Sequence, residues 1–500
     1  MPPSDRFTVN SFTEANLFDA LSVPPCSIHD ISQNEVAKYL FAYLGAIGVN
    51  TIVVELDYVD ADYLDDYANF YAKSFEPIPK RCRRLHFFTT SFDSASFLDY
   101  VVGVRSHDLL QESYAGFVVA RPLPTATLGR TVLATYPSDA GRRHYPTTRT
   151  YHVNLFGMGL QVESLAFQMQ DTSLAACATV ALWSCFQKTQ DIFKSLAPTP
   201  VAITRAANRL LASARPFPSR GLQVQQICNA IAAVGLDPEV YSVTPSLPLA
   251  SLVYSYLRLG LPVLALVKIP NLGGHAIALT GYSMRDTQQL ALEGGAVQSL
   301  FPKLIGSRID EFYAHDDQKG PFRRLRLNSA TGPDSIVTFR DSGWPGDLVP
   351  EFLIIPVYPK IRTGFREVSK YLLLLSTVAG WVCTVADFEW DVYLTSANDF
   401  KKSIHSDPNL NAHPMKEKLL LDGFPKYLWR CVLRLGGLPL LEMLLDTTVM
   451  VSGFPIRNLW WYQDVPRGGV AALIAQPGVE ATLVAGFGPR FVELLKASCV

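Results

Sequence analysis

Cys177 stands near the start of a predicted helix, where a cysteine can act as a nucleophile. In the segment Gln170-Asp-Thr-Ser-Leu-Ala-Ala-Cys177, Asp171 and Ser173 are favoured N-cap residues, and the residues after them form helix readily. In a first helical turn, unpaired backbone N–H groups and the positive end of the helix dipole lower the pKa of a thiol. Because a thiolate attacks acyl carbons, this segment predicts covalent acyl chemistry.

Cys185 lies farther along the same predicted helix and has a different expected role. Ala178, Ala181, Leu182 and Cys185 are spaced i, i+3, i+4 and i+7, which places them on one apolar stripe. We therefore expect Cys185 to pack in a core rather than to react.

His275 is the candidate base for such a thiol. It opens an apolar strand directly after two glycines, in Asn271-Leu-Gly-Gly-His275-Ala-Ile-Ala-Leu-Thr-Gly-Tyr282. An imidazole at the mouth of a buried strand could take a proton from a neighbouring thiol. Taken alone, however, this motif favours a structural histidine bonded to a loop carbonyl.

A carboxylate from a further strand is predicted to orient this histidine. The segment Phe312-Tyr-Ala-His-Asp-Asp317 runs into a turn, and if its strand lies beside that of His275, Asp316 can bind the second ring nitrogen and fix the tautomer. Asp317 is the second choice. His315 is a competing base, but strand alternation points it to the face opposite Asp316.

The elements that must position these residues indicate three regions. Helices are expected over 222–234 and 249–259, and strands over 262–268, 275–280, 322–327, 335–339 and 352–358. The strands of 322–339 form a predicted hairpin, and 352–358 could close the same sheet. Helices followed by strands are typical of an α+β domain.

The regions on either side have different patterns. Strand-like segments at 51–56 and 85–90 with a helical segment at 63–73 suggest an α/β arrangement, whereas 362–500 shows helical runs near 416–421 and 440–445. We therefore expect an α/β N-terminal region (1–115), an α+β catalytic domain (116–361) and a mostly helical C-terminal accessory domain (362–500).

Composition limits the classes of partner and compartment. The chain has 44 Lys and Arg against 45 Asp and Glu, so no overall field favours nucleic acid or an anionic membrane. Its eight cysteines lack the short spacings of a disulfide framework or a zinc site, so neither a metal nor another cofactor is expected. The first residues lack the apolar core of a secretion signal, which favours the cytoplasm.

Two further segments have simple structural interpretations. The uncharged stretch 371–386 is shorter than the ~20 residues of a spanning helix, so we expect a buried element rather than membrane insertion. The acidic run 57–66 lacks the spacing of a calcium-binding loop, so we expect a solvated helix start.

The order of these parts resembles the papain-like fold, in the branch of the bacteriocin-processing (double-glycine leader) cysteine peptidases. The similarity covers roughly 165–345: the Cys177 helix, the segment 221–236, the helix-to-strand junction at 257–264, the His275 strand and Asp316. The resemblance implies a papain-like fold, with a helix that carries the nucleophile packed on an antiparallel sheet that carries the base and the carboxylate.

Residue roles follow from this resemblance. It implies that Cys177 attacks the acyl carbon, that His275 takes the thiol proton and later protonates the leaving amine, and that Asp316 orients His275. Gln170 and the backbone N–H of Cys177 would form the oxyanion hole. Gln170 stands somewhat farther from the cysteine than is usual in this family, so Asp171 is an alternative for this role.

Two more positions depart from the family pattern. Ala178 follows the cysteine where the double-glycine peptidases usually have Gly, and Asp317 stands where Pro often follows the third member of the triad. A Gly-Gly leader substrate is not implied, because the chain has no phosphate-binding Gly-Lys-Ser/Thr loop of an attached transporter.

These observations together predict a cysteine peptidase that hydrolyses a peptide bond in a specific protein substrate. The large flanking regions, or a regulatory protein partner, would control access. Two alternatives stay open: an acyltransferase, amidase or deamidase that uses the same residues, and a catalytically silent interaction protein with a papain-like core.

Overall fold

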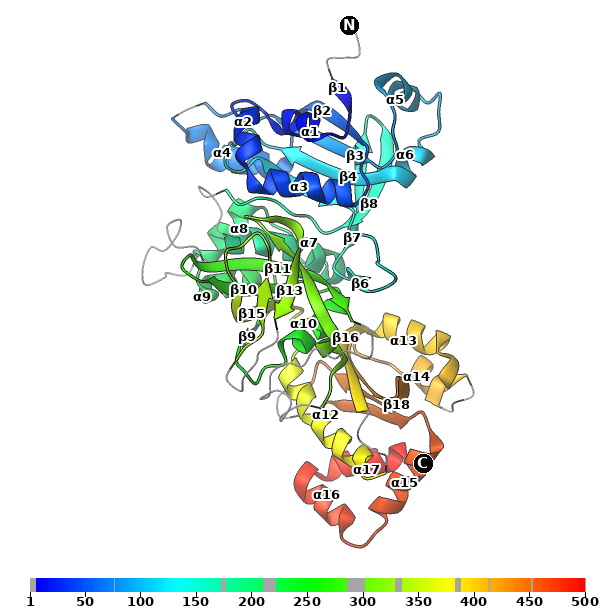
Figure 1. The fold of residues 1–500 in the computed structure, drawn as a ribbon. Coiled ribbons are helices and arrows are strands. Elements are labelled where there is room, and N and C mark those ends of the chain that lie inside the picture. Colours follow the sequence, from blue (N-terminus) through cyan, green and yellow to red (C-terminus); the bar gives the residue numbers. More distant parts are fainter. Residues whose placement is uncertain are drawn as a thin grey trace.

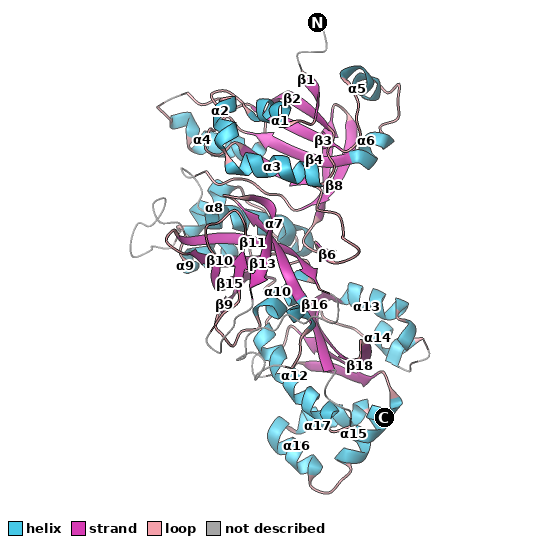
Figure 2. Cartoon of the chain, in the orientation of Figure 1, coloured by secondary structure: helices cyan, strands magenta, loops and turns pink. Residues whose placement is uncertain are grey.

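The chain forms a mixed α+β structure of three units that follow one another along an elongated molecule (Figure 1). The computed structural model describes residues 6–75, 77–171, 177–209, 222–285, 302–328, 335–382, 388–411, 413, 415–450 and 453–499. Each unit has its own antiparallel sheet with helices against it, and Figure 2 shows how the two element types alternate in space.

The N-terminal unit is built on a five-stranded sheet of order β1-β2-β3-β4-β5. Its strands are β1 (Phe7–Ser11), β2 (Thr51–Tyr58), β3 (Cys82–Phe88), β4 (Tyr114–Ala120) and β5 (Leu128–Leu133). Its helices are α1 (Glu14–Leu21), α2 (Ile28–Gln33), α3 (Glu35–Ala46), α4 (Ala61–Asn69), the 3-10 helix η2 (Tyr71–Lys73), α5 (Ser94–Val101) and α6 (Asp108–Ser113). Leu17, Leu40 and Ile52 belong to one buried cluster, which joins α1 and α3 to this sheet.

Two expectations for this unit need correction. Every neighbouring strand pair is antiparallel, so the region is α+β rather than α/β, because its helical connections return each strand beside its predecessor in the opposite direction. The sheet also continues through β4 and β5, so it crosses the boundary expected between residues 115 and 116.

The acidic run also differs from the prediction of a solvated helix start. Asp60 does cap α4, since its side chain accepts from the Tyr63 backbone N–H, but Asp60, Asp62 and Asp66 are all buried. Arg130 compensates part of this charge through a 2.6 Å ion pair with Asp62.

The central unit carries the predicted chemistry on a sheet of order β14-β13-β12-β11-β10-β15-β9, with β6 beside β11. The strands are β6 (Arg143–His144), β9 (Asp237–Ser242), β10 (Val263–Ile269), β11 (Gly273–Met284), β12 (Ile309–Asp316), β13 (Gly320–Asn328), β14 (Thr338–Arg340) and β15 (Val349–Val357). The helices are α7 (Cys177–Phe193), α8 (Pro200–Ala207), α9 (Val224–Ala233), α10 (Leu249–Leu257) and the 3-10 helix η3 (Ile305–Arg308). A separate hairpin of β7 (Arg149–Leu155) and β8 (Met158–Ser164) precedes them.

The sequence prediction for this central unit is confirmed at the level of elements. The predicted hairpin exists as the antiparallel pair of β13 and β14, and β15 joins the same sheet between β10 and β9. Helix α7 packs on β11 and is buried along most of its length. Cys185 is fully buried within it, as its helical phase predicts, and burial raises the pKa of its thiol to about 12.

The C-terminal unit contains a four-stranded antiparallel sheet of order β16-β17-β18-β19, which the expectation of a mostly helical region did not include. The strands are β16 (Phe388–Ser396), β17 (Tyr427–Leu435), β18 (Leu438–Asp446) and β19 (Ile456–Trp461). The helices are α12 (Phe365–Gly380), α13 (Ala397–Ser406), the 3-10 helix η5 (Pro408–Leu410), α14 (Met415–Leu421), α15 (Asp464–Ile474), α16 (Val479–Phe487) and α17 (Pro489–Ser498).

The run 440–445, for which the sequence predicts a helix, lies in the strand β18, and both faces of this strand are covered. Leu440, Leu441, Met443, Leu444 and Leu445 are all buried in β18, so the sequence shows no period of two. A continuous apolar run fits a buried helix as well as a buried strand, and only its pairing with β17 and β19 shows that it is a strand.

The uncharged stretch 371–386 begins inside α12, where Leu372, Leu375 and Val378 are buried, and 383–386 lie outside the described residues. Across the described chain, no single helix is both long and apolar enough to cross a membrane. The segments Pro466–Ile474 and Val479–Phe487 meet those criteria only as a pair, with a bend of 95°.

Candidate active site

Three elements of the central unit bring the predicted residues to one place. Cys177 is the first residue of α7, His275 lies at the start of β11, and Asp316 is the last residue of β12. Strands β11 and β12 are antiparallel neighbours, so the start of β11 and the end of β12 lie at the same end of the sheet. Helix α7 packs on β11, and the side chain of its first residue, Cys177, interacts with the His275 imidazole.

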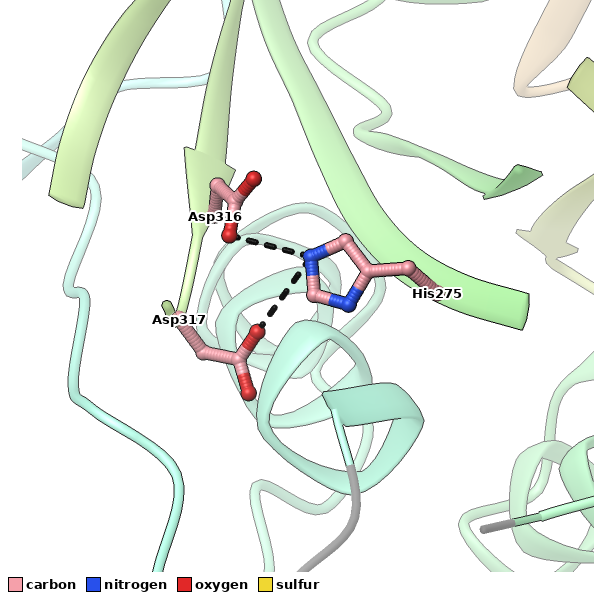
Figure 3. Close-up of side chains that lie close together, drawn as sticks. All are labelled: His275, Asp316 and Asp317. Atoms are coloured by element: carbon pink, nitrogen blue, oxygen red, sulfur yellow. Dashed lines mark hydrogen bonds and ion pairs between the residues drawn. The ribbon is translucent and has the colours of Figure 1, made fainter. Parts of the chain in front are cut away.

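The imidazole of His275 is held by Asp316. The Nε2 atom lies 3.0 Å from Asp316 Oδ1, and both side chains are almost completely buried (Figure 3). Asp316 is itself fixed by two donors: the Trp344 indole Nε1–H donates to Oδ2 at 2.9 Å, and the Gln318 backbone N–H donates to Oδ1 at 3.0 Å. The carboxylate is therefore rigid and can orient the ring.

The second ring nitrogen of His275, Nδ1, is not bonded to Asp316 or Asp317. With Nε2 turned to the carboxylates, Nδ1 points away from them, and it is buried without a well-aligned hydrogen-bond partner in the described part of the chain. The side chain of Cys177 interacts with the imidazole and is one of the groups that raise its pKa. Cys177 is half-buried, so its thiol is the more accessible end of this arrangement.

Charge on the ring is favoured despite its burial. Burial alone would lower the pKa of His275, but the charge and hydrogen bond of Asp316, with smaller contributions from Cys177 and Asp317, raise it well above its usual value. For Asp316, burial acts to raise the pKa, and His275, Trp344 and Gln318 together hold it below its usual value. These opposite directions favour an imidazolium paired with a carboxylate.

Asp317 is a second carboxyl group against the same ring. Its Oδ1 lies 3.7 Å from His275 Nε2, and neither oxygen has a hydrogen-bond partner among the described side chains. Burial, reinforced by the neighbouring charge of Asp316 and opposed by His275, raises the pKa of Asp317 to about 7. Asp316 is thus the orienting residue, and Asp317 lies beside it as a carboxyl that can be neutral.

His315 does not compete as a base. As strand alternation predicts, it points away from Asp316: its Nδ1 accepts from the Phe322 backbone N–H, so the bond between Nε2 and the Leu165 carbonyl at 3.0 Å requires a proton on Nε2. Burial lowers its pKa to about 4, which keeps this histidine neutral.

The two oxyanion candidates, Gln170 and Asp171, precede the described start of α7. Gln170 is half-buried, and Asp171 is buried near Tyr63 and Asp66 of the N-terminal unit, whose pKa values it helps to raise. The residues that join them to the helix, 172–176, lie outside the described residues. No contact in the described part brings Gln170 to His275, so its role stays a prediction.

Trp344 is a site residue that sequence reasoning missed. Besides its bond to Asp316, its ring packs against the imidazole, with the centroids 5.3 Å apart. It lies in a turn between β14 and β15, and an isolated tryptophan after Asp-Ser-Gly has no period or motif that links it to a distant histidine.

A metal ion would find three ligand atoms here. His275, Asp316 and Asp317 each offer one atom, all within 4.8 Å of one another. However, both oxygens of Asp316 already accept hydrogen bonds, and Nε2 must carry a proton to donate to it, which suits an orienting carboxylate better than a metal ligand. Of the two carboxylates, only Asp317 has oxygens that accept no hydrogen bond in the described part of the chain.

A scan against protein-family models finds no match, and a search of the curated proteins finds none either.

Proposed function

We propose that this protein is a papain-like cysteine peptidase that hydrolyses a peptide bond in a specific protein substrate. The observation that supports it most is the division of the His275 ring, with Nε2 bonded to Asp316 and the Cys177 side chain acting on the same buried imidazole. A nucleophile, a base and a residue that orients the base are thereby adjacent, on one helix and two paired strands.

The proposed reaction uses each group in turn. Cys177 is the nucleophile as a thiolate paired with the His275 imidazolium, and its sulfur attacks the carbonyl carbon of the scissile bond. His275 then donates a proton to the departing amine, which leaves an acyl thioester on Cys177. A water molecule, deprotonated by His275, attacks the thioester and releases the acid, so thiolate and imidazolium are restored.

Gln170 and the Cys177 backbone N–H are the proposed donors to the oxyanion. The flanking units would select which protein segments reach Cys177. A thiolate nucleophile works in a reducing compartment, for which we propose the cytoplasm.

The first experiment measures alkylation of Cys177 by iodoacetamide as a function of pH. We expect Cys177 to be labelled rapidly at neutral pH, because the adjacent His275 imidazolium would stabilise its thiolate. Cys228, which is also half-buried and whose pKa is raised by burial, is the internal control. A Cys177 profile that follows that of an ordinary thiol would contradict the proposal.

The second experiment separates peptidase from acyl-transfer chemistry. The wild type is incubated with a peptide library, and cleavage is followed by mass spectrometry, with Cys177→Ser as the inactive control. Cleavage by the wild type alone supports the proposal. Reactive Cys177 without cleavage of any peptide would favour a transferase, amidase or deamidase.

A further inference from the structure

The C-terminal unit contains a cavity that lies far along the chain from the Cys177 site. It has a volume of about 260 Å³ and lies beside β19, between the start of α14 and the end of α17. Its wall includes Lys418 from α14, Leu459 and Trp461 from β19, Arg467 from α15 and Ala497 from α17. The cavity is thus bounded by a strand and three helices.

Strand β19 is at the edge of its sheet and directs backbone groups into this space. The Tyr462 N–H donates to the Leu440 carbonyl on β18, so by antiparallel alternation Trp461 and Leu459 point their N–H and C=O groups away from β18. The Trp461 carbonyl accepts from His413 Nε2 at 2.9 Å. Within the described chain, the backbone N–H groups of Leu459 and Trp461 have no hydrogen-bond partner, although Leu459 is buried.

The charged residues that line the cavity are all basic. Lys418, Arg457 and Arg467 line it, and no lining residue is acidic. Arg457 is neutralised by Asp422 at 3.3 Å, and Arg467 lies 2.9 Å from Asp464, a carboxylate that is 87% exposed and therefore easily exchanged. Lys418 is exposed and makes no ion pair with the described residues.

Two buried polar side chains also lack partners here. Asn458 and Trp460 line the cavity, and the Asn458 Oδ1 and Trp460 Nε1 atoms are buried with no hydrogen bond in the described structure. Because a buried polar atom without a hydrogen-bond partner is unfavourable, a wall with these open groups is suited to a ligand that supplies both donors and acceptors.

We propose that this cavity binds an extended acidic peptide segment of a partner protein, whose backbone carbonyls accept from the Leu459 and Trp461 N–H groups at the buried edge of β19. A peptide backbone supplies the alternating N–H and C=O groups that a strand edge requires. Glutamate or aspartate side chains on it meet Lys418 and Arg467. The site is independent of Cys177 and does not rest on the proposed peptidase activity.

The test measures binding of a fluorescein-labelled pentapeptide, Glu-Val-Glu-Val-Glu, by fluorescence anisotropy. The full chain is used with Cys177→Ser, so that turnover cannot affect the result. We expect saturable binding that weakens at high salt. A Lys-Val-Lys-Val-Lys probe should not bind, and methylation of the central backbone nitrogen of the acidic probe should weaken binding about tenfold, the cost of a lost backbone hydrogen bond.

Matched variants locate the binding. Lys418→Glu and Ala497→Glu place a negative charge in the cavity at exposed positions and should each weaken binding about tenfold. Lys416→Glu changes the same charge on the same helix but outside the cavity and should bind normally. No binding of the acidic probe, equal binding of the N-methylated probe, or full competition by inorganic phosphate would each overturn strand addition.

Discussion

At the scale of single residues, the proposed chemistry depends on how His275 is shared. One ring nitrogen is committed to Asp316, whose other oxygen is committed to Trp344, so the ring cannot turn without breaking a buried hydrogen bond. The second nitrogen is therefore held in a fixed direction, and the Cys177 side chain acts on this oriented ring. The resulting charge separation makes the reactivity of Cys177 depend on Asp316.

Replacement of Asp316 should therefore reduce the nucleophilicity of Cys177. The charge of Asp316 raises the pKa of His275, so Asp316→Asn lowers that pKa, weakens the imidazolium and leaves less thiolate. We expect alkylation of Cys177 near pH 6.5 to slow by roughly tenfold to a hundredfold, as a free thiol is only about 1% ionised there. Asp399→Asn, at an exposed carboxylate of the C-terminal unit, should leave the rate unchanged.

Asp317 predicts a pH dependence of stability. Its pKa is about 7 in the folded chain and near ~3.9 when unfolded, so the folded state holds the proton more tightly and unfolding free energy falls as pH rises from about 4 to 7. Asp317→Asn removes this loss. We expect the variant to gain roughly 1–3 kcal/mol over wild type between pH 4.5 and 7.5, measured by urea unfolding. A constant difference across that range would contradict the assignment.

At the scale of elements, the strands and helices around the site were predictable, but the turns that complete it were not. The glycines before His275 and the apolar residues after it predict β11, and the spacing of Ala178, Leu182 and Cys185 predicts α7. The contact of Trp344 with Asp316 joins residues 28 positions apart through a turn. Local pattern carries no information about such a contact, which depends on how β14 and β15 pair.

The turn that carries Trp344 gives a prediction for this element. Trp344→Phe removes the N–H that helps to hold the pKa of Asp316 down, so the folded pKa of Asp316 rises toward its unfolded value. We expect a loss of about 1–3 kcal/mol at neutral pH, which shrinks below ~3.9, where the unfolded state protonates, and disappears only below the folded pKa of Asp316, where both states are protonated. Urea unfolding measures it, with the exposed Trp381→Phe as control. A deficit that persists in acid would point to lost packing alone.

At the scale of the whole molecule, the N-terminal unit reaches the site through the turn after β12. Tyr39 of α3 lies with its ring 4.2 Å from the Arg323 guanidinium, and Arg323 forms a bidentate ion pair with Asp341 at the base of the Trp344 turn. A Cβ on Gly320 would lie 2.3 Å from the Tyr39 ring, so the two units are in close contact there. Sequence alone could not predict this contact, since it joins residues about 280 positions apart.

This contact predicts that a residue outside the central unit affects the proposed reaction. Tyr39→Leu keeps an apolar side chain but removes the aromatic face from Arg323, which loosens the support of Asp341 and, through the turn, of Trp344. A cation–π contact of about 0.5–1 kcal/mol corresponds to a roughly twofold to fivefold lower rate of Cys177 alkylation if the loss is fully transmitted. Tyr39→Phe keeps the ring and loses only the hydroxyl bonds to Tyr136 and to the Phe322 carbonyl, so it should retain the wild-type rate. Equal losses in both variants would instead assign the effect to those hydroxyl bonds, and an unchanged rate in Tyr39→Leu would show that the two units contact each other without influencing the site.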